Sequence, residues 1–538
     1  MSKLHSFTFI FIILSSAIGR ADNYILDLTD SSIKASGDLV LNLADSSIHG
    51  PPQVANYQAV SASLTSSQFT VGDGSHGVFD SSTYENFSVN SDLSGNVIRI
   101  DTDTYSALHF TSFRLDAGWT IRPTGSKPLI IYSQSTVYID GSIDCSGEDG
   151  SAGNDDETQQ SSGGTGVCGG GDGGAGGYYN TASTSLVDAA SGSSGGSSVS
   201  GGGNPASDAT NGGKGGAGGG AYSQSGTGAD QGVNPDGGNS GTAGTNFQND
   251  EFSEIGGGSG GSGGAGFYSA TPANDASGGG GGAGGGSILI YAFGDVTITD
   301  NGSVLANGGD GGASSQGAGG GGAGGGGSIA IFSAGDIIIN NTVSAVEGSG
   351  GTSSTGGAGG DGGRGRTWVV DSSGTAGGDT LENPDTQLVA RGTVNAASGT
   401  FDLVSSEMDL QNSLPLLVQS LSTESLSASS SLAITFASGE NSGFTPSYLS
   451  LSSFDQENSF RYWRLKLSLS QDTSGSFSKI TRLGYEYTPN QEDEFNFVSA
   501  CGVIKPSSQI PKAFLLLYLL PLVLFVFLRA RKTSPIYA

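Results

Sequence analysis

The sequence SILIYAFGDVTI at residues 287–298 returns as SIAIFSAGDIII at residues 328–339, a spacing of 41 residues. In both copies apolar, largely β-branched residues lead to a Gly-Asp pair, a pattern typical of short β-strands separated by a turn. A further short strand is expected after each copy, at 303–306 and 343–346. A repeat of this size buries its apolar face only by stacking on the next copy, so the sequence predicts a parallel β-solenoid.

Glycine-rich tracts separate these strands. The chain has 95 glycines in 538 residues, and most of them lie between Gly147 and Arg366. A third strand copy, at 128–144, precedes this region. Fifteen prolines and no strict three-residue period exclude collagen. Chains of Gly-Gly-X can form extended threefold helices of the polyglycine-II type, which hydrogen-bond laterally, and flexible spacers are the alternative.

Charge and motifs argue against several functions. The 50 Asp+Glu against 21 Lys+Arg give a net charge of −29, which disfavours nucleic acid as a partner. We find no nucleophile motif and no paired carboxylates that would mark a hydrolase built on a β-helix, so we expect no catalytic residue, no cofactor and no enzyme. The histidines show no metal-ligand spacing, and aspartates among the glycines resemble calcium-binding turns without their nine-residue register, so no metal site is predicted. These residues are His5, His49, His76 and His109, and Asp149, Asp172 and Asp310.

The two ends of the chain carry export and anchoring signals. Residues 1–21 have a basic start, an apolar run and small residues at a cleavage position, as in a secretory signal peptide. Residues 513–528 form an apolar run of about 24 Å as a helix, followed by a basic tail at 529–538. The tail predicts a membrane helix with the large N-terminal part outside the cell.

The three cysteines are expected to have two roles. In an oxidising compartment Cys145 and Cys168 form a disulfide candidate that closes a loop of about 23 residues. Cys501 is unpaired in this scheme and lies in the spacer at 498–512, which precedes the apolar run.

Two β-rich modules are expected to flank the glycine-rich repeat region, 147–370. Residues 22–146 form the N-terminal one, and 380–497 form a C-terminal one that looks like a discoidin-like β-sandwich, a fold often used to bind glycans. In the second module, 460–469 alternates as a half-buried strand, and 481–487 is its expected partner. Within that strand Tyr462 and Trp463 are more often core residues than a sugar platform.

Two features resemble a known group of proteins. A cysteine, a short spacer, an apolar run and terminal arginines at about 500–532 resemble the myxosortase-type sorting tails of bacterial surface proteins. The pattern of strands and glycine tracts at about 70–370 resembles glycine-rich exported surface proteins of predatory and gliding bacteria. The resemblance implies that the tail is a processing signal and that Cys501 is the sorting or anchor candidate, for cleavage or for modification and attachment. A plain single-span anchor is the alternative.

The fold class expected from these observations is all-β, with solenoid strands, glycine tracts and a C-terminal sandwich. We expect an exported structural or adhesive protein at the cell surface or outer membrane, with the glycine region as a shaft. The membrane is the expected partner of the C-terminal helix, and surface glycans or other surface proteins are further candidates. The alternative is a carbohydrate-binding surface protein acting through residues 380–497.

Overall fold

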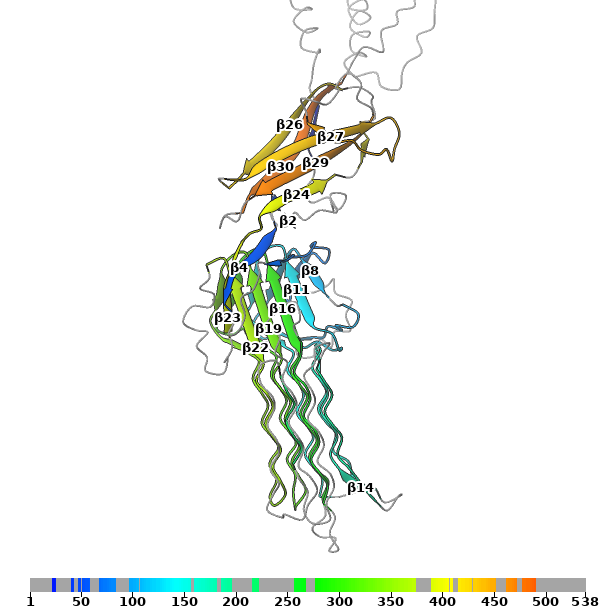
Figure 1. The fold of residues 1–538 in the computed structure, drawn as a ribbon, viewed down its shortest axis with the longest axis vertical. Helices are drawn as coiled ribbons and strands as arrows, with labels where there is room; N and C mark the ends of the chain where they lie inside the picture. Colours follow the sequence, from blue (N-terminus) through cyan, green and yellow to red (C-terminus); the bar gives the residue numbers. More distant parts are fainter. Residues whose placement is uncertain are drawn as a thin grey trace, which may run out of the picture. The chain divides into compact units, whose positions relative to one another are not determined.

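The computed structural model builds the chain from β-strands joined by turns and extended segments (Figure 1). No helix occurs among the residues that the structure describes, so the all-β prediction is confirmed for them. The described residues are 22–25, 40–42, 47–49, 51–58, 67–83, 96–105, 107–155, 159–180, 185–195, 215–221, 256–267, 276–373, 389–405, 407–409, 415–427, 429–450, 461–471 and 477–489.

The 41-residue repeat is a pairing register between parallel strands. Ser287 lies opposite Ser328 in the first strand pair, and Val296 lies opposite Ile337 in the second. The third pair is offset by two residues, because the preceding turn is shorter in the second copy. The first copy supplies β16 (Ser287–Ala292), β17 (Val296–Ile298) and β18 (Ser303–Leu305), and the second supplies β19 (Ser328–Ser333), β20 (Ile337–Ile339) and β21 (Thr342–Ser344).

The three strands of each copy enter three different sheets. The eight-stranded sheet has the order β5-β4-β23-β22-β19-β16-β11-β8, the β12 sheet β20-β17-β12-β9-β6 and the β13 sheet β21-β18-β13-β10-β7. Every pair is parallel except those made by β4. The remaining strands are β4 (Pro52–Gln58), β5 (Ser67–Gln68), β6 (Val78–Asp80), β7 (Val97–Ile98), β8 (Leu108–Phe110), β9 (Ser112–Leu115), β10 (Thr120–Ile121), β11 (Leu129–Ser133), β12 (Val137–Ile139), β13 (Ser142–Asp144), β22 (Arg366–Asp371) and β23 (Val389–Ala396).

Side chains from all three sheets form one buried apolar cluster. Ile290 contributes to it from the eight-stranded sheet, Val296 from the β12 sheet and Val304 from the β13 sheet. The eight-stranded sheet has a second apolar cluster, in which Phe332 and Trp368 are fully buried. Since both faces of this sheet are covered, β19 and β22 are buried at every residue, which explains the apolar run 329–332 in β19; the polar ends of β22, Arg366, Thr367 and Asp371, are buried as well.

Two antiparallel five-stranded sheets hold most of the C-terminal strands. One has the order β1-β30-β3-β2 with β26 beside β30, and the other β24-β29-β27-β28 with β25 beside β29. A buried cluster joins them through Ile48 and Ile480 of the first and Leu465 and Leu467 of the second. Their strands are β1 (Asp22–Ile25), β2 (Val40–Asn42), β3 (Ser47–His49), β24 (Gly399–Val404), β25 (Met408–Asp409), β26 (Pro415–Ser425), β27 (Ser431–Gly439), β28 (Leu449–Ser450), β29 (Tyr462–Gln471) and β30 (Lys479–Pro489).

The expected pairing of the last two strands is wrong. β29 is the predicted half-buried strand, with strictly alternating burial, but β30 lies in the other sheet. The two edges of β29 are taken by β24 and β27. Because Leu465 and Leu467 pack in one cluster with Ile480, the two consecutive strands face each other across the buried cluster.

Glycine tracts run side by side as extended threads from the strands β16, β19 and β22 (Figure 1). We call them the glycine bundle. Its described parts are 145–153, 161–177, 188–195, 215–221, 256–267, 276–286, 306–327 and 345–365. The antiparallel pair β14 (Tyr178–Asn180) and β15 (Ser185–Val187) joins two of these tracts.

Candidate functional site

The tract 278–286 lies inside the glycine bundle, and every one of its backbone N–H groups donates to another tract. Gly279, Gly282 and Gly285 donate to the carbonyls of residues 319, 322 and 325. Residues 280, 283 and 286 donate to the carbonyls of residues 151, 148 and 145. Residues 278, 281 and 284 donate to those of residues 177, 174 and 171. The N···O distances are 2.7–3.0 Å. Successive backbone N–H groups therefore point in three directions in turn, and the pattern repeats every three residues.

Carbonyl groups of the same tract accept from three further segments. Gly279 and Gly282 accept from residues 264 and 261, Gly280 and Ala283 accept from residues 312 and 309, and Gly281 accepts from Gly164. Residues 278–286 thus have six hydrogen-bonded neighbouring segments: two each from the parts 161–177 and 306–327, and one each from 145–153 and 256–267. The tract 319–327 donates in the same threefold way, to 259–265, to 357–363 and to 306–312.

Glycine is required here because the backbones approach too closely for side chains. A Cβ atom on Gly324 would lie 1.9 Å from the carbonyl oxygen of Ala283, and one on Gly281 would lie 2.1 Å from that of Gly261. Both tracts nevertheless contain one alanine, Ala283 or Ala323, and both alanines are fully buried. Which tracts can pack side by side is therefore determined by the positions that have no Cβ atom and by the few positions where the Cβ atom of an alanine fits.

Aspartates accept backbone N–H groups at the exposed margin of the bundle. Asp149 Oδ1 accepts from the N–H of Asp310 at 2.8 Å, and Asp310 Oδ1 accepts from that of Ser349 at 2.7 Å. Asp172 and Asp361 do the same for Gly166 and Gly350, both at 2.8 Å. No group of three metal-ligating side chains occurs within the described ranges. The aspartates that resemble calcium-binding turns in sequence thus replace missing carbonyl acceptors between outer tracts.

The predicted disulfide between Cys145 and Cys168 is confirmed, with a Cα–Cα distance of 5.9 Å and both residues fully buried. Its two residues also bind the start of β16. The carbonyl of Cys145 accepts from Gly286, and that of Cys168 accepts from Ser287, both at 2.8 Å. The covalent link therefore lies where the glycine bundle meets the parallel strands.

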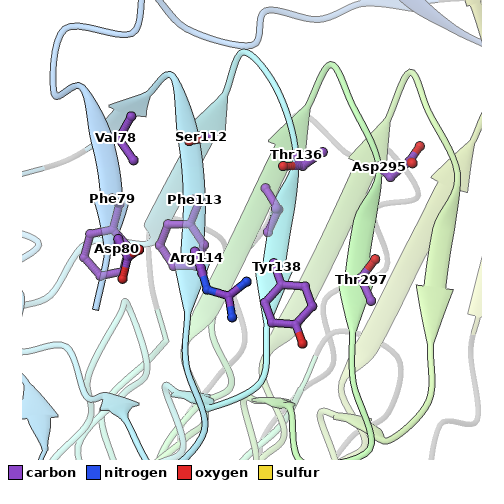
Figure 2. A pocket seen from close by; sticks show the side chains of 11 residues that line it. Val78, Phe79, Asp80, Ser112, Phe113, Arg114, Thr136, Tyr138, Asp295 and Thr297 are labelled. Atoms are coloured by element: carbon purple, nitrogen blue, oxygen red, sulfur yellow. The ribbon is translucent and has the colours of Figure 1, made fainter. Parts of the chain in front are cut away.

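A second candidate site lies on the outward face of the β12 sheet (Figure 2). One side chain from each strand forms a row that we call the outer row, and its members are aligned by the strand register. A cavity of about 420 Å³ adjoins the row. The outer row consists of Asp80, Arg114, Tyr138, Thr297 and Ile338.

Arg114 is the central cation of this face. Its guanidinium lies 4.5 Å from the ring centroid of Tyr138, and its Nε donates to Asp116 Oδ1 at 2.8 Å. Figure 2 shows the guanidinium beside the Tyr138 ring. A stacked guanidinium with one paired nitrogen keeps its other N–H groups available to acceptors on a ligand.

Two carboxylates near Arg114 are held in their charged form. Hydrogen bonds from Ser82 lower the pKa of Asp80, and a hydrogen bond from Thr299, supported by Asn301, lowers the pKa of Asp140. The positive charge of Arg114 lowers both pKa values further. These groups are therefore suited to accept hydrogen bonds and unsuited to act as general acids near neutral pH.

Two histidines that look unrelated in sequence lie together. The rings of His76 and His109 stack at 6.0 Å, and His76 Nδ1 accepts from the backbone N–H of His109 at 2.9 Å. Burial lowers the pKa of His109, while the nearby carboxylate of Asp73 opposes that shift. His109 lies in β8, which pairs with β11 of the third repeat copy, whereas His76 precedes β6, which pairs with β9, so no pattern in the sequence links the two histidines.

Trp463 and Tyr462 in the C-terminal sheets have different environments. Trp463 is fully buried in the cluster that joins the two sheets, as expected for a core residue. Tyr462 is half-buried, with the Arg461 guanidinium 5.2 Å from its ring centroid. Arg461 itself pairs with Asp409, and Lys466 pairs with Asp402 at 2.6 Å.

Several predicted features lie outside the described residues. They are the signal peptide at 1–21, Cys501 with its spacer, the apolar run at 513–528 and the basic tail. In the part of the chain that is described, no helix is long and apolar enough to span a membrane. Comparison of the chain with protein-family models, curated proteins and solved structures gave no match.

Proposed function

We propose that the chain is an exported structural or adhesive protein of the cell surface, in which the glycine bundle is a stiff shaft. The observation that carries the proposal is the threefold hydrogen bonding of 278–286 to six neighbouring segments. A flexible spacer would leave these N–H groups to water. Here each one has a backbone partner, so the tracts resist bending and local opening.

In finer terms, we propose that the tracts are polyglycine-II-type helices and that the parallel strands of the three sheets form a β-solenoid which anchors them. Support comes from the three-residue period of the donors and from the one-strand-per-sheet order of each repeat. We further propose that the two antiparallel sheets form a β-sandwich, because one apolar cluster draws residues from both. In this arrangement the disulfide secures the bundle to the solenoid.

The proposed attachment is a C-terminal membrane anchor or a sorting tail processed near Cys501, and the proposed role is non-enzymatic. The depressed pKa values of Asp80 and Asp140 favour binding over proton transfer on the outward face of the β12 sheet. Glycan binding through residues 380–497 receives less support. Trp463 is buried there, and the Arg461 guanidinium beside Tyr462 is engaged in an ion pair with Asp409.

Hydrogen exchange on the full-length protein in detergent tests the shaft. We expect amides of 278–286 to exchange as slowly as those of β16 and β19, which serve as internal references. Exchange within seconds along the whole tract would overturn the proposal. Labelling of intact cells with an antibody to the described part tests export, since an intracellular protein would be labelled only after lysis.

A further inference from the structure

We propose that the outer row of the β12 sheet is a binding site for an extended neutral polysaccharide. This inference adds a ligand to the proposed surface role and rests on that role, because such polymers are met outside the cell. It places the site in the parallel strands, at a distance in sequence from the C-terminal module.

The position of the outer row decides how a ligand can be recognised. β9, β12 and β17 are interior strands of their sheet, so their backbone N–H and C=O groups are already paired with neighbouring strands. A peptide cannot add to them as a further strand, since strand addition requires a free sheet edge. A ligand on this face is therefore bound through side chains alone.

The side chains around the cavity offer a dense set of groups that bind hydroxyls. Ser112, Thr136 and Thr297 line it with hydroxyl groups, and Tyr138 adds a phenol. None of these four hydroxyls donates to or accepts from another described residue. Together with the terminal nitrogens of Arg114 they can act as donors or acceptors toward a polyhydroxylated chain.

The charges around Arg114 select against acidic polymers. Asp80, Asp116 and Asp140 lie close to this single cation, two of them with lowered pKa values. Uronic acids or sulfate groups would meet repulsion from these carboxylates, whereas neutral hydroxyls can donate to them. The site is thus complementary to a neutral sugar.

The spacing of the row fits a repeating ligand. Neighbouring strands of a sheet lie about 4.8 Å apart, which is close to the length of one sugar unit in an extended chain. Val78 at one edge strand of the sheet is 69% exposed, and Ile338 at the other edge strand is 48% exposed. Their apolar surfaces, with the Tyr138 ring, can pack against the C–H faces of successive sugars.

Co-sedimentation and calorimetry with the full-length protein in detergent test the proposal. The probes are neutral polymers (cellulose, mannan, chitin and a β-1,3-glucan) and two acidic ones (alginate and heparin). We expect at least one neutral polymer to bind and both acidic ones to bind less well. Tyr138→Ser should weaken binding at least tenfold, and Thr297→Val should weaken it several-fold.

Tyr462→Ser is the matched control, because it removes a half-buried aromatic side chain beside an arginine in the C-terminal module. It should leave binding unchanged, whereas loss of binding with this variant alone would place the site in that module. Binding of none of the neutral polymers, or equal binding by Tyr138→Ser and the unmodified protein, overturns the proposal. If Tyr138→Ser does not fold, Tyr138→Phe and Thr297→Val decide the outcome.

The proposed shaft is measured separately on the same samples. Slow exchange of 278–286 without polysaccharide binding would reject this site and leave the shaft standing. Fast exchange together with binding that depends on Tyr138 would reject the shaft and leave the site standing.

Discussion

The parallel strands and the glycine bundle are both buried, but by different means. In the strands, side chains such as Ile290 and Ile331 fill the interior. In the bundle, tracts such as 278–286 are fully buried with hardly a side chain, and the backbones themselves are in contact. The strands are thus stabilised mainly by removal of apolar surface from water, and the bundle mainly by satisfied hydrogen bonds and close approach.

This difference changes which substitutions each region should tolerate. An apolar core accepts another side chain of similar size, because volume and polarity are what matter. The glycine bundle has no spare volume at most positions, so even one methyl group meets a backbone carbonyl. Glycine loses more conformational entropy on folding than other residues, and in the bundle many regular hydrogen bonds must offset that loss.

The largest effect is expected from a single methyl group added to the bundle. Gly324→Ala should destabilise the tract by at least about 3 kcal/mol, the upper end of usual overpacking costs, since its Cβ would meet the Ala283 carbonyl. The control is the reverse change one residue earlier, Ala323→Gly, which should cost only about 0.5–1 kcal/mol. Opening free energies from hydrogen exchange of 319–327 measure both, and equal effects would contradict the close-packed bundle.

The junction between the two regions is tested by removing the disulfide. The double variant Cys145→Ser, Cys168→Ser should lose about 3 kcal/mol, the value expected for a loop of this length. Because the two cysteine carbonyls also bind the start of β16, protection should fall at both ends of the junction. Melting with and without reductant checks this: reductant should lower the melting temperature of the unmodified protein and leave the variant unchanged.

The smallest expected effect concerns the margin of the bundle. Asp310→Ala leaves the Ser349 N–H without its acceptor and should cost about 1 kcal/mol, since the site is exposed to water. Asp300→Ala is the control, because no described residue donates to or accepts from that side chain. Hydrogen exchange at Ser349 should accelerate in the first variant alone. Faster exchange in both would indicate a general charge effect instead of a specific hydrogen bond.

The strands of the fold were predictable because their signal is local. Alternation and the Gly-Asp turns locate β16, β17, β19 and β20, and the spacing of the copies gives their register. The pairing of β29 was predicted wrongly for a related reason. Alternation identifies a half-buried strand but does not say whether the next strand lies beside it or across the buried cluster.

The candidate sites were only partly predictable. The cysteine pair follows from there being two cysteines in one region of a chain that is expected to be exported. The outer row does not, because Asp80, Arg114 and Tyr138 come from separate strands and meet only through the sheet register. The aspartates of the bundle were visible as a motif, but their acceptor role depends on which tract lies next to them.

The sequence by itself determined the all-β class of the described residues, where the repeat lies and that glycine is concentrated between the copies. The tertiary structure alone decided which glycine tracts are neighbours, and that β1 and β3 pair with β30 from the far end of the described chain. The physical reason is that a glycine backbone offers the same donor and acceptor at every residue. Its partner is fixed by the strands on which each tract begins, and by the few positions where a Cβ can be accommodated.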